Sequence, residues 1–306
     1  MNRLLFTLLL MSLVFVACED WRIQSDDDSS DDDDSSDDEP LPPAPAMISG
    51  GGYHSCVIDS AGAIQCWGDN TYGQTSAPAG VFTQLNSGFY HSCALTSAGT
   101  AACWGPGASG QTSPPATLFT QVSAGGNHSC GVDLTGEIEC WGAGQTDEGA
   151  WPHLGQSIAP SGPFSQVVAG YGYTCGLRTS GLVECWGEDL YGRASPPPTV
   201  FTQISGAYYH TCGLTLLGAV ECWGSDTSGQ SSPPPMTFTQ ISTGSYHACG
   251  ISAGAVVCWG GNNHGQSAAT AGTFEQVGLG EFHTCARTSD GSVTCWGKDQ
   301  QGQASP

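Results

Sequence analysis

The chain has 306 residues, of which only 11 % are charged and 44 are glycine, a composition that disfavours helices. Its formal net charge is −22, with 28 acidic residues against 6 basic ones. Such a surface repels phosphate backbones, because nucleic-acid affinity depends on Lys and Arg displacing counterions, so we expect no binding to nucleic acid.

The first segment predicts export. Residues 4–17 form an apolar run behind Arg3 that is shorter than a membrane span and typical of a secretory signal peptide. It ends in Phe-Val-Ala-Cys at 15–18, which resembles the lipobox of bacterial lipoproteins, although Leu is usual where Phe15 stands. We therefore predict a lipoprotein signal peptide over 1–17, lipidation of Cys18 and a location in the bacterial cell envelope, at the outer membrane or the cell surface. An ordinary signal peptide with an incidental cysteine is the alternative.

Residues 18–46 have the composition of a disordered tether. Twelve of the 28 acidic residues lie between Glu19 and Glu39, interleaved with serines, and a Pro-rich stretch follows. Like charges repel and serine adds no core, so this segment cannot fold by itself. Calcium binding by the Asp run is a weaker alternative, since the run lacks the Gly and the ordered loop of a tight site.

Residues 47–306 carry a phrase of two cysteines, the second followed by Trp-Gly, that occurs seven times. The first copy reads YHSCVIDSAGAIQCWG over 53–68, and the first cysteines of successive copies are 37, 37, 45, 37, 37 and 36 residues apart. This period is typical of solenoids, propellers and helical arrays. The segments are short, rich in Val, Ile, Thr, Phe and Trp, and interrupted by Gly and Pro, which excludes a helical array. About 37 residues suit three or four short strands, so we predict an all-β, seven-bladed β-propeller over 47–306.

Each pair of cysteines lies on a predicted hairpin. In the first copy a turn at 60–62 places Cys56 opposite Cys66, with both side chains on one face. The sixth copy is one residue shorter, and a two-residue turn at 253–254 still places its cysteines opposite each other. A disulfide can span such a pair, and export allows it to form; reduced, buried cysteines are the alternative. The predicted bonds are Cys56–Cys66, Cys93–Cys103, Cys130–Cys140, Cys175–Cys185, Cys212–Cys222, Cys249–Cys258 and Cys285–Cys295.

The repeat unit resembles that of the regulator of chromosome condensation family. The matching features in the second copy are His91-Ser92, Leu95, Gly99, Trp104-Gly105 and Gly110-Gln111. The resemblance covers about 260 of the 306 residues and implies a seven-bladed β-propeller. The first copy has Pro45 where the other copies have a leading Phe. We therefore expect ring closure to pair Met47–Ser49 with the seventh copy.

The resemblance implies several functions. The family's founder is similar to a nuclear exchange factor for a small GTPase that binds chromatin, whereas secreted bacterial relatives look like binding scaffolds and one type inhibits β-lactamases through its propeller face. An exported chain does not meet cytosolic GTPases. We predict a monomeric, non-catalytic scaffold for an unknown protein or glycan partner, held at the membrane by lipid on Cys18, without a cofactor or metal. An exported enzyme that cleaves polysaccharide, or an exchange factor, are the alternatives.

Histidines and tryptophans recur at fixed positions and are candidates for chemistry. A His precedes the first cysteine by two residues in six copies, and Tyr173 replaces it in the fourth. Zinc would need four ligands, whereas each repeat offers three at most and the sulfurs are committed to each other. We therefore interpret the histidines as structural hydrogen-bonding groups and the seven Trp-Gly tryptophans as packing between blades.

The third copy contains an insertion of eight residues that no other copy has. Its segment reads WGAGQTDEGAWPHLGQ over 141–156 and adds Asp147, Glu148, Trp151 and His153. Loops on rigid scaffolds often carry function, and aromatic residues often anchor interfaces. We predict a partner contact at these four residues, with a functionally neutral insertion as the alternative.

Overall fold

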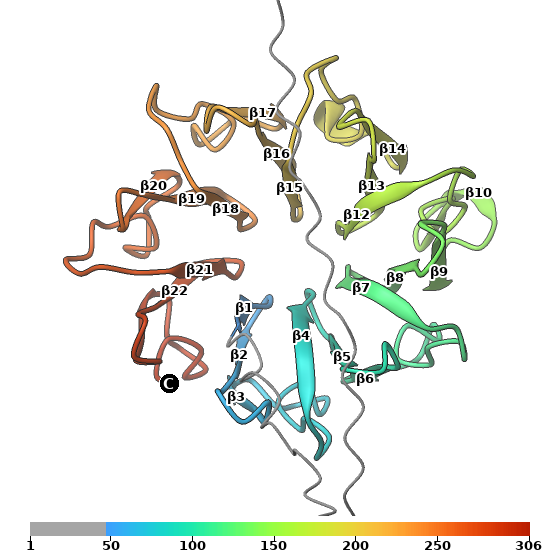
Figure 1. The fold of residues 1–306 in the computed structure, drawn as a ribbon, viewed down its shortest axis with the longest axis horizontal. Coiled ribbons are helices and arrows are strands. Elements are labelled where there is room, and N and C mark those ends of the chain that lie inside the picture. The colour runs from blue at the N-terminus through green and yellow to red at the C-terminus, as the bar shows by residue number, and fades with distance from the viewer. Residues whose placement is uncertain (1–46) are drawn as a thin grey trace, which may run out of the picture. The chain divides into compact units, whose positions relative to one another are not determined.

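The computed structural model describes residues 47–306, which form a closed ring of seven blades (Figure 1). The seven-bladed, all-β propeller predicted from the sequence is confirmed. The predicted signal peptide, the predicted lipidation site Cys18 and the predicted acidic tether lie outside the described residues. Among the described residues, no helix has the length and apolar character needed to cross a membrane.

Each blade is a three-stranded antiparallel sheet made from one repeat, and its first strand lies nearest the centre of the ring (Figure 1). The strands are, blade by blade, β1 Met47–Gly50, β2 His54–Ile58 and β3 Ile64–Gly68; β4 Phe82–Ser87, β5 Ser92–Thr96 and β6 Ala101–Trp104; β7 Phe119–Ala124, β8 His128–Asp133 and β9 Ile138–Gly142; β12 Phe164–Ala169, β13 Tyr173–Arg178 and β14 Val183–Gly187; β15 Gln203–Gly206, β16 His210–Leu214 and β17 Val220–Gly224; β18 Gln240–Thr243, β19 His247–Ser252 and β20 Ala255–Gly260; β21 Gln276–Leu279, β22 His283–Arg287 and β23 Val293–Gly297. The insertion adds the two-stranded sheet β10 Asp147–Ala150 and β11 His153–Leu154, and a short 3₁₀ helix, η1, covers Leu190–Gly192.

The predicted hairpin register is confirmed. Cys56 pairs with Cys66 between β2 and β3, and Cys249 pairs with Cys258 in the shortened sixth copy. The short turn there places Ala253 and Gly254 at φ 49° and 82°, as a tight two-residue connection requires. All seven predicted disulfides are present, each inside its own hairpin, with Cα–Cα distances of 4.0–4.1 Å.

The hydrophobic core lies between neighbouring blades. In one cluster Cys93 and Leu95 of the second blade pack against Phe119, Val122 and Trp141 of the third. The Trp141 Nε1–H donates to the carbonyl of Gln111 in the second repeat at 2.9 Å. The tryptophans therefore pack between blades, as the repeat pattern predicted.

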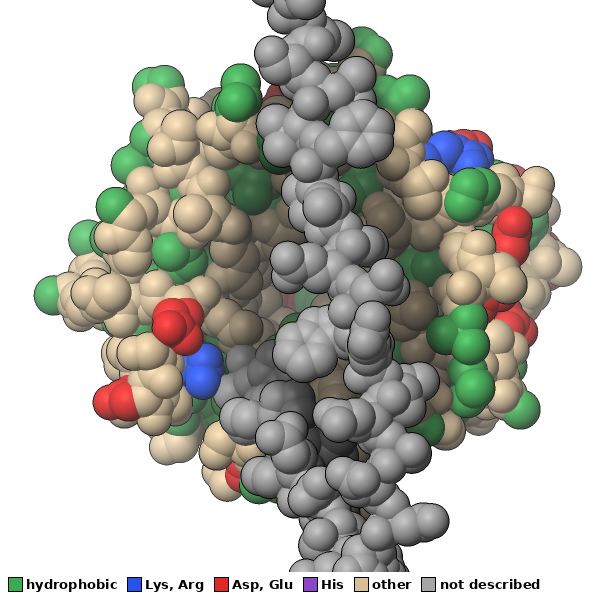
Figure 2. Space-filling model, viewed as in Figure 1, with side chains coloured by type: hydrophobic (Ala, Val, Ile, Leu, Met, Phe, Trp, Pro, Cys, Tyr) green, Lys and Arg blue, Asp and Glu red, His purple; other side chains and the backbone are tan. Residues whose placement is uncertain are grey.

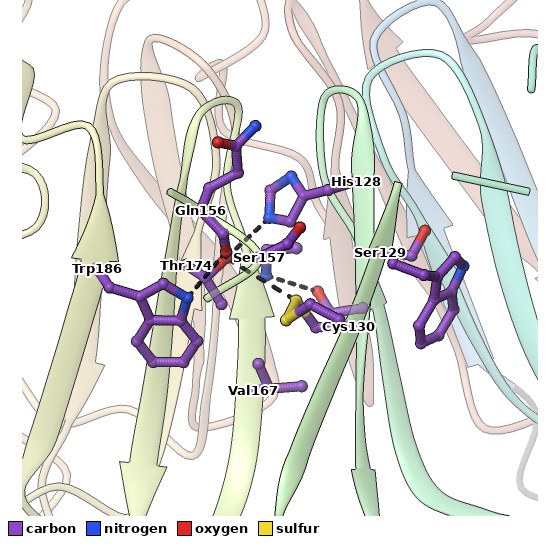
Figure 3. Close-up of a disulfide and its surroundings, with 12 residues drawn as sticks. His128, Ser129, Cys130, Gln156, Ser157, Val167, Thr174 and Trp186 are labelled. Atoms are coloured by element: carbon purple, nitrogen blue, oxygen red, sulfur yellow. Dashed lines mark hydrogen bonds between the residues drawn. A yellow bond between two sulfur atoms is a disulfide. The ribbon is translucent and has the colours of Figure 1, made fainter. Parts of the chain in front are cut away.

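Hydrogen bonds reinforce each of these interfaces, as Figure 3 shows for the third and fourth blades. The Trp186 Nε1–H donates to the carbonyl of Gln156 at 2.8 Å, and the Thr174 hydroxyl donates to the same carbonyl at 2.8 Å. Nε2 of the His128 ring lies 2.8 Å from that hydroxyl. Because the hydroxyl proton is already used, the imidazole must donate through Nε2–H. Five of the six histidines make this contact, which confirms their interpretation as structural hydrogen-bonding groups, whereas His210 has no partner at either ring nitrogen within the described residues.

The expected mode of ring closure is wrong. Met47–Ser49 belong to β1, which pairs with β2 of the same repeat and not with the seventh copy. Every repeat supplies its own three strands in order from the centre outward. No strand of one repeat therefore has to join the sheet of another where the first and seventh blades meet, which we call the seam. The seam is closed by the usual contacts: Ser55 Oγ lies 2.7 Å from His283 Nε2, and Trp67 Nε1 donates to the Gln303 carbonyl at 3.0 Å.

Glutamines on the innermost strands bridge one blade to the next. Gln121 Oε1 accepts from the Val167 amide at 2.6 Å, and its Nε2 donates to the Val167 carbonyl at 2.8 Å. Gln84 accepts from the Val122 amide in the same way at 2.8 Å. Met47 occupies this register position in the first blade, where it pairs with Ile58 as Gln84 pairs with Leu95. The ladder is therefore interrupted at the first blade.

Candidate binding face

The turns between the first and second strands of the blades carry most of the exposed aromatic side chains near the axis. In each repeat the tip of this turn is formed by the two residues just before the His that precedes the first cysteine by two positions; in the fourth repeat they stand before Tyr173. Eight of these fourteen residues are aromatic. They are Tyr53, Phe89, Tyr90, Tyr171, Tyr208, Tyr209, Tyr246 and Phe282, and all eight are partly exposed. We call this set the aromatic face.

Three of these rings meet across the axis of the propeller. The centroids of Tyr171 and Tyr208 are 3.9 Å apart, and Phe89 lies 5.4 Å from Tyr171 and 5.7 Å from Tyr208. They come from the second, fourth and fifth blades, so only the closed ring brings them together. They also line one end of a central cavity of about 260 Å³ whose wall is formed by the innermost strands.

The remaining rings continue around the axis. Tyr209 lies 4.1 Å from Tyr208 and 5.0 Å from Tyr246, and Tyr246 lies 5.2 Å from Phe282. The Tyr246 hydroxyl donates to the Tyr209 hydroxyl at 3.3 Å. The result is a nearly continuous aromatic surface that carries hydroxyl groups. Burial is the largest cause that raises the pKa values of Tyr53, Tyr208 and Tyr246, so these hydroxyls stay protonated.

The insertion joins this surface through Trp151. In the fourth blade Gly172 stands where four other repeats have a Tyr and a fifth has a Phe. A Cβ at Gly172 would lie 3.2 Å from the Trp151 ring, so the indole fills the space that a side chain there would take. Trp151 stacks on Tyr171, with centroids 4.6 Å apart and an interplanar angle of 7°, and remains 43 % exposed.

The other candidate residues of the insertion lie around this stack. Asp147 and Glu148 are exposed on β10, where Asp147 accepts from the Gly149 amide at 3.1 Å and Glu148 from the Thr146 hydroxyl at 3.0 Å. His153 is half-buried, and its Nδ1 accepts from the Gly144 amide at 3.3 Å. The structure therefore brings Trp151 onto the aromatic face and leaves the two carboxylates on the insertion's own hairpin.

Two charged groups lie within the aromatic face. Glu281 occupies a turn tip beside Phe282, and burial raises the pKa of its carboxyl group, although the nearby Tyr53 hydroxyl and the charge of Lys298 oppose that shift. Lys298 is the chain's only lysine. Its Nζ lies 5.2 Å from the Phe282 centroid and 5.6 Å from the Tyr53 centroid, within the range of a cation–π contact.

Other surfaces of the propeller are less distinctive. On the face that Figure 2 shows, charged side chains are few and lie toward the periphery. The most exposed large apolar residues are Leu216 and Leu217, at 84 % and 85 %, in the turn between β16 and β17. These two lie at the opposite end of the strands from the aromatic tips, and they are isolated rather than part of a cluster.

The buried histidines are poor candidates for metal binding or acid–base chemistry. Burial lowers the pKa values of His91 and His128 to about 3 and those of His54 and His210 to about 4. Within residues 47–306, no three His, Cys, Asp or Glu side chains gather as a metal site would require.

The sequence contained a signal for the aromatic face that the repeat pattern concealed. The two tip positions vary between copies and look unconstrained within one repeat. Compared across all seven repeats, they are predominantly aromatic. This enrichment at turn positions, where polar residues are usual, would have identified the face.

Comparison with known families supports the fold. The sequence model of the regulator of chromosome condensation (RCC1) repeat matches residues 48–74, 82–111, 119–146, 238–266 and 274–303. The unmatched repeats are the fourth, which carries Tyr173 in place of His and Arg193 in place of Gln, and the fifth. No curated protein matches the chain.

Several solved structures share the architecture. The CRINKLY WD40 ectodomain of the receptor kinase ACR4 from Arabidopsis thaliana is 26 % identical, with a TM-score of 0.68 over 82 % of this chain and 94 % of that one. The entire ectodomain of the Physcomitrella patens receptor kinase CR4 is 23 % identical, with a TM-score of 0.67 over 82 % of this chain and 73 % of that one. Prp20p from Saccharomyces cerevisiae, described with its binding to Gsp1p and histones, is 16 % identical with a TM-score of 0.59 over 72 % of each chain.

Proposed function

We propose that this chain, which belongs to the RCC1-repeat family of β-propellers, is an exported, non-catalytic scaffold that binds a protein or glycan partner. Seven disulfides fit an oxidising compartment, and the chain resembles receptor ectodomains. A lipid anchor on Cys18 at the bacterial cell envelope is part of the proposal and is supported by the lipobox-like sequence alone. The likeness to Prp20p concerns the fold and gives no support to exchange activity.

The aromatic face is the observation that carries the proposal. Soluble proteins rarely expose contiguous aromatic surface without a function, and Tyr and Trp are enriched where binding energy concentrates. Here the rings stand on turns that are fixed by the buried neighbouring residue. His91, for example, follows Phe89 and Tyr90 directly, is fully buried, and bonds the Ser129 hydroxyl of the next blade at 2.7 Å. A surface fixed in this way loses little conformational entropy on binding.

Loss of single rings tests the scaffold function. Trp151→Ala, Tyr208→Ala and deletion of residues 146–153 should each weaken capture of the partner, measured with the full chain against cell-envelope extract and against a panel of purified glycans. We expect a loss of about tenfold or more for the two alanine variants, as for residues at the centre of an interface.

A matched control comes from the turn between β16 and β17. Leu217→Ala removes a larger exposed apolar area than either test residue offers, yet it should leave capture unchanged. Equal losses in the control and test variants, or full capture by the Trp151 and Tyr208 variants, would remove the aromatic face from the proposal.

A further inference from the structure

In five consecutive blades, from blade five round to blade two, an aromatic residue directly precedes the buried His, and those of blades six, seven, one and two form one group. We call Tyr246, Phe282, Tyr53 and Tyr90 the aromatic arc. Glu281 lies within it, since its amide donates to the Gly51 carbonyl beside the Tyr53 tip at 3.3 Å and its charge raises the pKa values of Tyr53, Tyr90 and Tyr246. One acidic group therefore faces three tyrosines from three other blades.

The Glu281 carboxylate is incompletely satisfied. Its Oε2 atom is buried and receives no hydrogen bond from any donor in the described part of the chain. A buried carboxylate oxygen without a donor is costly, and a cationic donor satisfies it best. The neighbouring tip residues Gly52 and Ser245 are small, and Glu281 lines the wall of the central cavity close to its aromatic end.

The arc already holds one ammonium group. Lys298 Nζ lies over the rings of Phe282 and Tyr53 at 5.2 and 5.6 Å. Within residues 47–306 it is the only basic residue outside an ion pair, because Arg178, Arg193 and Arg287 each face a glutamate. The intramolecular contact shows that the ring faces here are accessible and oriented for a cation.

The charge around the arc favours a cationic partner. Residues 47–306 contain 16 acidic side chains and 4 basic ones, a net charge of −12. Asp69, Asp226 and Asp299 lie close enough to buried histidines on this side of the blades to affect the pKa values of those histidines. Their own partners include loop amides and hydroxyls, so their negative charge is available to attract a positive surface.

We propose that the aromatic arc around Glu281 binds a cationic side chain, the ammonium of Lys or the guanidinium of Arg, presented by a protein partner. The cation lies against the electron-rich faces of the Tyr and Phe rings and donates a hydrogen bond to the Glu281 carboxylate. This inference rests on the proposed scaffold function and specifies its partner as a protein with an exposed basic residue. A neutral glycan could stack on the rings but would bring no cationic donor to the carboxylate.

Small probes test the inference directly on the full oxidised chain. Butylammonium and butylguanidinium are titrated against 1-butanol, a neutral probe of similar size, and binding is followed through the tyrosine ring signals in NMR spectra. The two cations should bind more tightly than butanol, and their affinity should fall as salt is added. Equal binding of cations and butanol would overturn the proposal.

Two substitutions assign the effect to the arc. Glu281→Gln keeps the shape and a polar group near Tyr53, and should weaken cation binding about tenfold while leaving butanol binding unchanged. Lys298→Met removes the competing ammonium group and should strengthen cation binding. The control Glu139→Gln removes an exposed carboxylate on β9 and should change nothing. Unchanged affinity in Glu281→Gln, or weaker binding in Lys298→Met, contradicts the proposal.

The failure of this inference is distinguishable from failure of the scaffold function. If Trp151→Ala and Tyr208→Ala lose capture while Glu281→Gln retains it and the cationic probes do not bind, the scaffold function stands and the cation site is wrong. Binding of a neutral oligosaccharide at the arc, with no binding of butylammonium, would likewise replace the basic protein with a glycan.

Discussion

Replacing Ala248 by Thr should stabilise the propeller, because it repairs the one interface that lacks the hydrogen bond from a buried His or Tyr to a hydroxyl of the next blade. At five of the seven junctions between blades, Nε2 of a buried His lies 2.7–2.8 Å from a Ser or Thr hydroxyl of the next blade, and at a sixth the Tyr173 hydroxyl makes this contact with Thr211 at 2.8 Å. At the junction of the fifth and sixth blades the residue is Ala248, and His210 has no partner at either ring nitrogen within the described residues.

The size of the effect follows from the neighbouring junction. There the Thr284 hydroxyl receives His247 Nε2–H at 2.8 Å and donates to the Gln266 carbonyl at 2.9 Å. Ala248→Thr offers both bonds, and it satisfies a buried nitrogen whose isolation costs about 1–3 kcal/mol. We expect a gain of about 1–2 kcal/mol in the free energy of unfolding, or roughly 2–6 °C in Tm for a domain of this size.

Thermal and denaturant unfolding of the oxidised protein measure this gain, and Thr284→Ala is the matched reverse change. It should cost about 1–3 kcal/mol, because it leaves His247 without its acceptor. If Ala248→Thr gains nothing and Thr284→Ala costs nothing, the bond between blades has no energetic weight and the reasoning is wrong.

The fifth repeat differs from the others at a second position, three residues before its His, and this difference calls for one more variant. Three residues before His247 stands Gly244, where a Cβ would lie 2.6 Å from the His247 ring; the fifth repeat has Ala207 at that position. By this comparison the Ala207 methyl group would clash with a His210 ring placed like that of His247, so we infer that the His210 ring is shifted. If Ala248→Thr alone gains little, the combined Ala207→Gly and Ala248→Thr variant should show the full gain, and its failure to do so refutes the geometric account.

Three further predictions concern stability. The buried histidines have pKa values of about 3–4, against 6.5 in the unfolded chain. The stability that their neutral forms contribute is therefore present above pH 6.5 and is lost as the pH falls toward 4, by about 2 kcal/mol per His at pH 5. A Tm that stays constant between pH 7 and pH 5 would contradict this. Thiol titration of the denatured, unreduced protein should detect no free thiol among the fourteen cysteines of the repeats, and reduction should cost about 2–3 kcal/mol per bridge in the chain-entropy estimate. Met47→Gln should add the missing rung of the glutamine ladder and raise the free energy of unfolding by about 0.5–1.5 kcal/mol in denaturant titrations, whereas Gln121→Met should lower it.

The sequence predicted those features that depend on neighbours along the chain. The pairing of Cys249 with Cys258 in the shortened hairpin follows from strand alternation and turn length, which operate over a few residues. Ring closure was mispredicted because the first repeat lacks its leading Phe, which suggested an incomplete blade. In fact Met47 begins an ordinary inner strand, and the strand needs backbone partners rather than that Phe.

The aromatic face could not be assembled from local rules. Phe89 and Tyr208 lie 119 positions apart, in the second and fifth blades, and they meet only because seven blades close around one axis. The same distance in sequence explains why Glu281 gave no signal of its own. An isolated acidic residue in a turn is unremarkable until the ring places three tyrosines from other blades around it.

The interior and the aromatic face depend on each other through the turn tips. Every tip residue is one or two positions from a residue that is fully buried and, at six of the seven junctions, hydrogen-bonded to the next blade. The bonds that hold neighbouring blades together therefore also fix the spacing of the aromatic rings. A partner that contacts rings from several blades must match this spacing. Its affinity therefore depends on the buried hydrogen bonds between blades, although the partner does not contact them. Closure without a shared strand is consistent with this view, because the interface at the seam has the same His–hydroxyl and Trp–carbonyl bonds as other interfaces and so holds its tips in the same way.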